Sequence, residues 1–262
     1  MQRSLPLILF FFACETFDIN TDNPLDPNNP DYNEPTISIS GVDNNQTIIT
    51  NNIDITLKGN ENVSEYRYQI LSSDPFIDMG SNWSEWTASN IISLEYLNEF
   101  TYLFVAQSRY LTEEVSANAS VTFTVDAVKP SSLLFYPNQL QSDIFENSTF
   151  ELYAHDLPNV SVLEFIIEYG ASSISFAPDE GSVEYGDVNV VTNLSSNRIQ
   201  YTIGKYGDNG FDQNALIAKI VFKAQNASGT SAVIKILSPI AKSLDGQTIE
   251  IVGTNQARVD VR

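Results

Sequence analysis

Few side chains of this 262-residue sequence could carry out a reaction on their own. It has one histidine, His155, and one cysteine, Cys14. Nucleophilic catalysis needs a nucleophile aligned with a base, which a third group in turn orients. His155 has Asp156 beside it, but the sequence offers no second histidine and no spare thiol. We therefore expect His155 to be a strand-end residue and the protein not to be an enzyme. A glycosidase stays as an alternative, because 33 acidic residues could supply a carboxylate pair.

Two acidic segments have a spacing that could bind calcium. In the first, Asn29 stands at the twelfth loop position, where calcium loops use a bidentate glutamate. The alternatives to calcium are a soluble linker for the first segment and a hairpin loop for the second. We expect no cofactor, with calcium as the one candidate. The first segment places its oxygen ligands at Asp18, Asn20, Asp22 and Asp26, and the second is Asp208-Asn209-Gly210-Phe211-Asp212.

The beginning of the chain is typical of an export signal. Arg3 precedes an apolar run over residues 5–13, which is too short to cross a bilayer because that takes about 20 residues. The end of this run, Phe12-Ala13-Cys14, resembles the lipobox of bacterial lipoproteins, in which the cysteine is lipidated and becomes the first mature residue. The resemblance implies a signal peptide over residues 1–13 and lipidation of Cys14. It also implies that the protein is held at the bacterial cell envelope, on the outer membrane or cell surface. An ordinary signal peptide is the alternative.

Residues 14–35 are predicted to form a flexible acidic tether. The stretch 15–35 has four prolines, six acidic side chains and no basic one, so it cannot bury enough apolar surface to fold. Proline would hold it extended at about 3.1 Å per residue. The whole chain has 13 basic and 33 acidic residues, a net charge of −20, which excludes nucleic acid and anionic lipid headgroups as partners. The membrane would then be reached through the lipid anchor only.

Residues 36–127 are predicted to form a β-sandwich, because short runs alternate apolar and polar residues between turn signals. The segment resembles fibronectin type III and related immunoglobulin-like domains. That resemblance implies a tyrosine corner, in which the Tyr102 hydroxyl bonds back to nearby backbone. The residues that carry it are Tyr66-Arg67-Tyr68, Trp83, Trp86, Leu97 with Tyr102, and Phe123-Thr124-Val125-Asp126.

Trp83 and Trp86 are the candidate binding residues of this domain. Trp83-Ser84-Glu85-Trp86-Thr87 also resembles the tryptophan-serine box of class I cytokine receptors, but that box precedes the last strand of its domain, and here two strand signals follow. Two alternatives remain open. One tryptophan fills the core while the other lies on the surface, or the two form an aromatic platform that stacks on sugar rings.

Residues 130–262 restart the alternating pattern after Lys129-Pro130, where proline favours a boundary. About ten short strands in this segment predict a two-sheet jelly roll. The segment resembles cohesin domains, which capture dockerin-bearing enzymes in polysaccharide-degrading assemblies. The resembling stretches are residues 150–154, 157–160, 163–169, 199–203 and 216–224, followed by Gly229 and Asp245-Gly246.

The sequence thus predicts an all-β protein with two β-sandwich domains, immunoglobulin-like and then cohesin-like, after a signal peptide and a flexible linker. The predicted function is that of a non-catalytic surface lipoprotein. Its cohesin-like module would bind dockerin-like or other surface or secreted proteins, in polysaccharide degradation or in adhesion. The alternatives are a carbohydrate-binding module that recognises polysaccharide directly and a spacer without a ligand.

Overall fold

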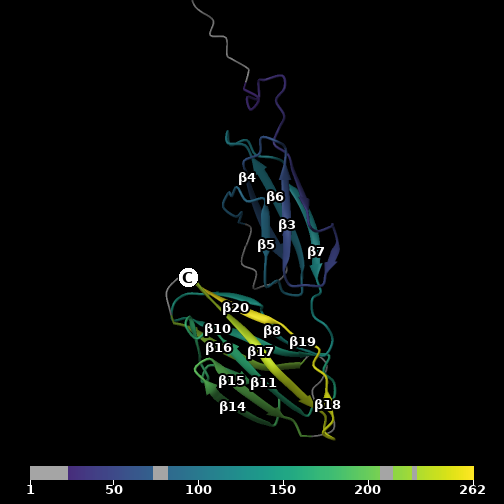
Figure 1. Ribbon diagram of the computed structural model, residues 1–262, viewed down its shortest axis with the longest axis vertical. Helices are drawn as coiled ribbons and strands as arrows, with labels where there is room; N and C mark the ends of the chain where they lie inside the picture. The colour runs from purple at the N-terminus through teal and green to yellow at the C-terminus, as the bar shows by residue number, and fades with distance from the viewer. Residues whose placement is uncertain (1–22, 73–81, 207–214, 226–228) are drawn as a thin grey trace, which may run out of the picture.

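The computed structural model describes residues 23–72, 82–206, 215–225 and 229–262. Every regular element among these residues is a β-strand, and the strands divide in chain order between two sandwiches (Figure 1). The predicted all-β class with two sandwich domains is therefore confirmed. No helix in this part of the chain is long and apolar enough to span a bilayer.

The first sandwich packs a three-stranded sheet on a four-stranded one. The three-stranded sheet has the order β1-β3-β5, and the four-stranded sheet has the order β2-β7-β6-β4. All neighbours are antiparallel except β2 and β7, which run parallel. The strands are β1 Ile37–Ser40, β2 Gln46–Ile48, β3 Ile53–Gly59, β4 Glu65–Ser72, β5 Ile91–Leu94, β6 Thr101–Arg109 and β7 Ala119–Val125.

The core of the first sandwich follows the period of two that its strands show. Ile55 and Leu57 of β3 are fully buried, and Phe104 of β6 and Phe123 of β7 are buried opposite them. Tyr102 stacks on Phe123 with ring centroids 5.4 Å apart. Burying each of these side chains stabilises the fold by about 1.5–3 kcal/mol, so this alternation accounts for the two-layer packing.

The tyrosine corner is present as the sequence predicts. The buried Tyr102 hydroxyl donates to the backbone carbonyl of Asn98, at 2.9 Å, across the turn that leads into β6. The bond ties the connection between the two sheets to the start of a core strand, because the donor belongs to β6 and the acceptor to the preceding loop.

Tyr102→Phe should lower the free energy of unfolding of the first domain by about 1 kcal/mol, because the substitution removes the buried hydrogen bond to the carbonyl of Asn98, which also accepts the amide of Phe100. Chemical denaturation with and without the substitution measures the loss. The matched control is Tyr206→Phe at an exposed ring, which should change stability by less than about 0.5 kcal/mol. Equal effects of the two substitutions would contradict the role of the corner.

The second sandwich is larger and packs two sheets face to face. One sheet has the order β12-β16-β10-β8-β19, with β13 paired to β16; the other has the order β14-β15-β11-β17-β20-β9, with β18 paired to β17. The longer strands are β8 Ser132–Tyr136, β9 Gln139–Ser142, β10 Asn147–His155, β11 Val162–Tyr169, β14 Val188–Ser195, β15 Arg198–Gly204, β16 Ala215–Ala224, β17 Thr230–Lys242 and β20 Gln256–Val261. The short ones are β12 Ile174–Phe176, β13 Ser182–Val183, β18 Thr248–Ile249 and β19 Gly253–Thr254.

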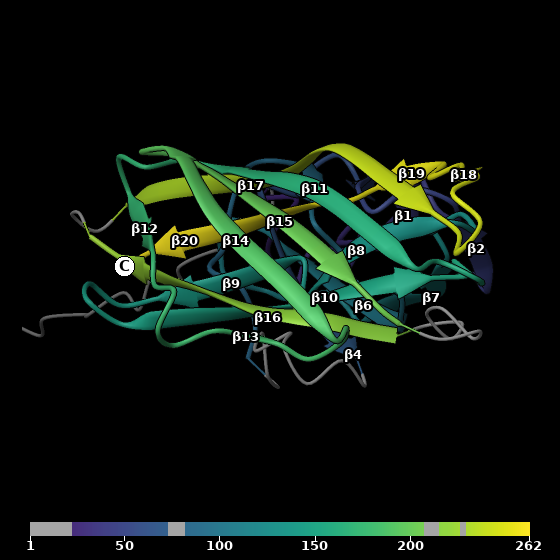
Figure 2. The same cartoon turned by 90° about the horizontal axis from the view of Figure 1, so that it is seen from below.

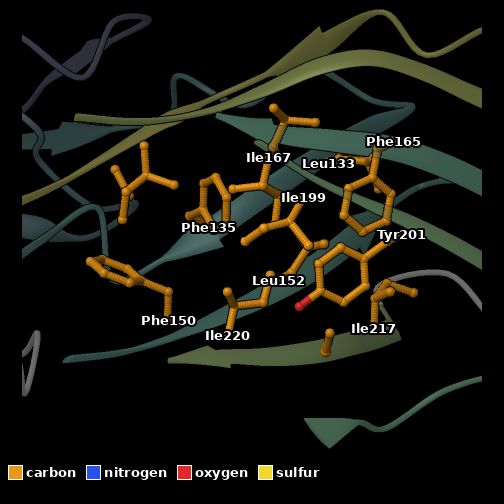
Figure 3. Close-up of a cluster of buried hydrophobic side chains, with 14 of the residues drawn as sticks. Leu133, Phe135, Phe150, Leu152, Phe165, Ile167, Ile199, Tyr201, Ile217 and Ile220 are labelled. Atoms are coloured by element: carbon orange, nitrogen blue, oxygen red, sulfur yellow. The ribbon is translucent and has the colours of Figure 1, made fainter. Parts of the chain in front are cut away.

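Six aromatic rings pack among the aliphatic side chains that make up most of the core of the second sandwich. Phe165 and Tyr201 come from neighbouring strands of one sheet and stack at 5.2 Å. Phe135 and Phe150 come from the other sheet and meet edge to face at 6.1 Å (Figure 3). Each of these rings is at most 4% exposed. The buried side chains of the two sandwiches form two distinct clusters, so each domain has its own core.

The end of the tether, over residues 23–32, is folded into turns. Three turns follow one another, in which the amides of Asp26, Asn29 and Tyr32 donate to the carbonyls three residues earlier. The side chains of Asn23, Asp26 and Asn29 each accept the amide two residues on. The extended conformation expected here is therefore wrong, because an Asn or Asp followed by proline is the typical start of a turn.

The last residues of the tether are bonded to the first domain. The Tyr110 hydroxyl donates to the carbonyl of Asn33 at 2.7 Å, and the Asn60 side chain donates to that of Glu34 at 3.1 Å. These contacts fix the direction in which the chain enters β1.

Polar contacts join the two domains. The Glu99 carboxylate accepts the amides of Ala127 at 2.7 Å and Val128 at 2.8 Å, which holds the connecting segment against the first domain. Desolvation raises the pKa of this carboxyl group. The Asn138 amide donates to the Asn98 side chain at 2.7 Å, and the Asn138 side chain donates to the carbonyl of Leu97 at 2.8 Å. These contacts hold the domains together at one place on each.

Candidate binding surfaces

The outer face of the second domain carries an exposed apolar patch. The pairing of β14, β15, β11 and β17 places two rows of outward side chains side by side. One row is Val190, Thr202, Glu164 and Ile240, and the other is Val188, Gly204, Val162 and Lys242. We call the outward side chains of these four strands the docking face.

The apolar members of the docking face are unusually open to solvent. Val162, Val188, Val190 and Ile240 are between 39% and 53% exposed and stand in adjacent rows. Single exposed apolar residues are ordinary, but a contiguous group rimmed by polar residues is typical of a protein–protein contact. On the docking face, Thr202, Gly204 and Glu164 stand between these four residues, so the face mixes apolar and polar side chains, as protein–protein interfaces do.

The charge of the docking face differs from that of the chain. Its cations are Arg198, Lys235 and Lys242, and its carboxylates are Glu164 and Glu168, against a net charge of −20 for the whole protein. Glu168 is paired with Arg198, with a nitrogen–oxygen distance of 2.5 Å. The two lysines are exposed and belong to β17, at one side of the face. An acidic partner would therefore be attracted here and repelled by most of the remaining surface.

Strand β14 forms an open edge of this face. Among the described strands it pairs only with β15, and all eight of its residues are exposed. Val191 points to the same side as the buried Tyr201 but is 41% exposed, so β14 extends beyond the sheet below it. Figure 2 shows β14 and β15 nearest the viewer, with the first domain behind them. The edge is free of the first domain and has the backbone groups that bind an added strand.

Trp83 and Trp86 lie on the outside of the first domain, beside β4. The amides of Tyr66 and Thr87 donate to each other's carbonyls at 2.7 and 2.9 Å, which fastens the tryptophan segment along the edge of the sheet. Both indoles are partly exposed. The alternative that placed one tryptophan in the core is therefore wrong, because the segment runs along the edge of the sheet instead of crossing the core.

Each indole contacts an arginine. The Arg67 guanidinium carbon lies 4.7 Å from the ring centroid of Trp83 and 4.5 Å from that of Trp86, and that of Arg109 lies 4.4 Å from Trp86. Gln107 accepts from Arg67, and Glu65 pairs with Arg109 at 2.6 Å. Desolvation lowers the pKa of Arg67, with a further contribution from the charge of Arg109. Two cations over Trp86 leave less of its ring for a sugar, so this cluster favours a structural contact.

The other candidate residues separate into those that the structure describes and those outside it. His155 ends β10 as predicted, and its Nε2 lies 3.5 Å from Asp156 Oδ2. Asp26 belongs to a tether turn, where its side chain accepts the amide of Asn28. Within the described ranges, no three His, Cys, Asp or Glu side chains are grouped so that they could hold a metal ion. Cys14, Asp18, Asn20, Asp22 and residues 208–212 lie outside those ranges.

The chain is similar in structure to cohesins. No protein-family model and no curated protein matches it. The sixth cohesin of scaffoldin B from Acetivibrio cellulolyticus, in complex with a dockerin, has a TM-score of 0.44 and 12% identity over 51% of this chain and 100% of its own. A type I cohesin–dockerin complex from Clostridium thermocellum has a TM-score of 0.44 and 10% identity over 52% of this chain and 98% of its own. A non-cellulosomal cohesin from Archaeoglobus fulgidus has a TM-score of 0.42 and 8% identity over 51% of this chain and 92% of its own.

Proposed function

We propose that this chain is a non-catalytic, lipid-anchored surface protein of a bacterium, and that its second domain binds a dockerin-like protein through the docking face. The observation that carries the proposal is the set of exposed apolar side chains Val162, Val188, Val190 and Ile240, with Lys242 beside Val162. The sequence resemblance of residues 130–262 to cohesins supports the class of partner.

The remaining parts of the chain support display at a surface. The first domain is a sandwich joined to the second at a polar junction, so it would act as a spacer. The docking face lies on strands that do not take part in that junction, and β14 lies on the far side of the second domain (Figure 1). The first described residues of the tether and the docking face thus lie at opposite ends of the protein, so anchoring through the tether would leave the face open to partners (Figure 1).

Ile240→Asp should weaken partner binding at least tenfold, because it replaces an apolar contact by a second carboxylate beside Glu164, which must be desolvated on binding. The test captures secreted proteins of the source bacterium on the full-length chain and identifies by mass spectrometry those that share a domain. The affinity of each purified partner is then measured with both forms of the chain.

The control is Leu111→Asp, the same kind of change at a 79% exposed residue in the first domain, which should leave the affinity unchanged. Capture of no protein, or partners that bind wild type and Ile240→Asp equally well, would contradict the proposal. Retained binding with Leu111→Asp shows that added negative charge alone does not explain the loss.

A further inference from the structure

The edge of β14 is the longest strand edge that the described part of the chain leaves uncovered. Strands β1, β2, β5, β9 and β12 also lie at sheet edges but have only three or four residues each, and β19 has two. The eight-residue β4 is an edge as well, yet the tryptophan segment lies along it through the bonds between Tyr66 and Thr87. β14 has eight residues, and among the described strands only β15 pairs with it. Natural proteins usually shorten or cover their edge strands, because an open edge pairs readily with another chain.

β14 also lacks the features that protect an open edge. Residues 188–195 contain no charged side chain and no proline. The register shift in the pairing with β15 lies between Asn193 and Ser195, so residues 188–193 form a regular edge. Charges, prolines and bulges are the usual obstacles to pairing with another chain, and this stretch has none of them. Its outer backbone groups are therefore open to hydrogen bonds with an added strand.

The sequence of β14 is nearly symmetric about Val191. If a second copy of the strand ran antiparallel to the first, with Val191 opposite Val191, then Asn189 would face Asn193 and Val190 would face Thr192. Asparagine would meet asparagine, and β-branched side chains, which pack well between strands, would meet each other. A surface that is complementary to itself in this way fits a twofold dimer, in which both copies use the same patch.

The charge distribution also favours β14 as a contact between copies. The chain has a net charge of −20, so two copies repel each other over most of their surfaces. β14 itself is uncharged, and the one charged residue of the neighbouring β15, Arg198, is paired with Glu168. Two copies can therefore meet at this edge without bringing carboxylates of the paired strands together.

We propose that two copies of this protein associate through β14, by antiparallel pairing centred on Val191. The sheets that contain β14 would join into one continuous sheet across the twofold axis. Residues directly opposite each other in an antiparallel pair point to the same face, so the two docking faces would lie side by side on one face of the joined sheet. Two dockerin-like modules of one partner could then bind at once and gain avidity. This last consequence rests on the proposed function, whereas the dimer itself does not.

Sedimentation velocity of the full chain tests the dimer, in a Cys14→Ala background so that no acyl group can cause association. An eight-residue edge is small beside the about 20–30 residues a side of a stable interface, so the dimer should be weak. We expect reversible dimerisation with a Kd of about 100 µM or tighter. Raising the salt concentration from about 50 mM to about 500 mM should strengthen it, because salt screens the repulsion between two copies of charge −20.

Charged variants at the twofold axis test the register of the pairing. Val191→Lys and Val191→Asp should each weaken dimerisation at least tenfold, because each variant would place like charges directly opposite each other. An equal mixture of the two variants should associate at least tenfold more tightly than either variant alone, because a lysine would then face an aspartate. A variant that had failed to fold would not be rescued by mixing.

Val162→Lys is the matched control. Val162 is 39% exposed on β11, two strands away from the edge, so its substitution should leave dimerisation unchanged. A chain that remains monomeric at about 500 µM would overturn the proposal, since most of it would be dimeric at the expected Kd. A mixture of the Val191 variants that stays as weak as either one would also overturn it, as would a dimer that Val162→Lys weakens as much as Val191→Lys does. Capture of a protein through the docking face tests the proposed function separately, because a monomer could still bind that partner.

Discussion

Phe222→Ala is expected to lower the free energy of unfolding of the second domain by about 3–5 kcal/mol. The Phe222 ring is fully buried and lies 5.1 Å from Tyr169, 6.1 Å from Phe176 and 6.4 Å from Phe150, measured between centroids. These rings come from four strands in both sheets, so alanine would leave a cavity that no single neighbour can fill. A domain with 5–15 kcal/mol of total stability would lose a large part of it.

The matched control for this prediction is Phe145→Ala. Phe145 is 70% exposed in the turn before β10, so the same chemical change should alter stability by less than about 0.5 kcal/mol. Denaturant unfolding of both variants, followed by circular dichroism, gives the comparison. A loss below about 1 kcal/mol for Phe222→Ala would contradict the packing described for this core.

Cys14→Ala should release the protein from the membrane when it is produced in a bacterium that processes lipoproteins. Each buried methylene of an acyl chain contributes about 0.8 kcal/mol to membrane binding, and more than one chain gives durable attachment. The charge of −20 offers no electrostatic substitute for the lipid. Wild type should therefore appear in the membrane fraction and Cys14→Ala in the soluble fraction.

Fractionation and intact-mass measurement test the lipid anchor together. The wild-type protein should gain the mass of its acyl groups at Cys14, and the variant should show none. Asp18→Asn, a change in the same segment that leaves the cysteine in place, should remain with the membrane. Soluble wild type without added mass, or a membrane-bound Cys14→Ala, would show that the lipobox resemblance is misleading.

Strands with long alternating runs could be predicted from the sequence. Residues 163–169 and 216–224, in the segment predicted to be a jelly roll, lie within β11 and β16. β11 buries every second side chain, and β16 buries most of its side chains. The pattern did not reveal β2, β5 or β9, which have three or four residues each. Such short segments complete too few periods for alternation to stand out, and only their neighbours in the sheet define them as strands.

The candidate surfaces were harder to predict because they depend on pairing between distant segments. The docking face needs Ile240 beside Glu164, which are 76 positions apart and meet only through the register of β11 and β17. The hollow at the domain junction is lined by Asn51 and Asn255, which come from different domains. The tryptophan motif was visible in the sequence, but the contact of Arg109 with Trp86 depends on how β6 lies beside β4. By contrast, the tyrosine corner spans only four positions and could be predicted.

The parallel pairing of β2 with β7 affects how the first domain would respond to mechanical tension. Under the proposed arrangement, a lipid holds one end of the protein while a partner pulls on the other, so force enters before β1 and leaves after β7. Gln46 pairs with Phe123, Thr47 with Thr124 and Ile48 with Val125 in parallel register. Tension applied to opposite ends of parallel neighbours loads their hydrogen bonds in shear and all at once, instead of opening them one by one. The first domain would thus resist stretching, while the turns at residues 23–32 would lengthen first under load.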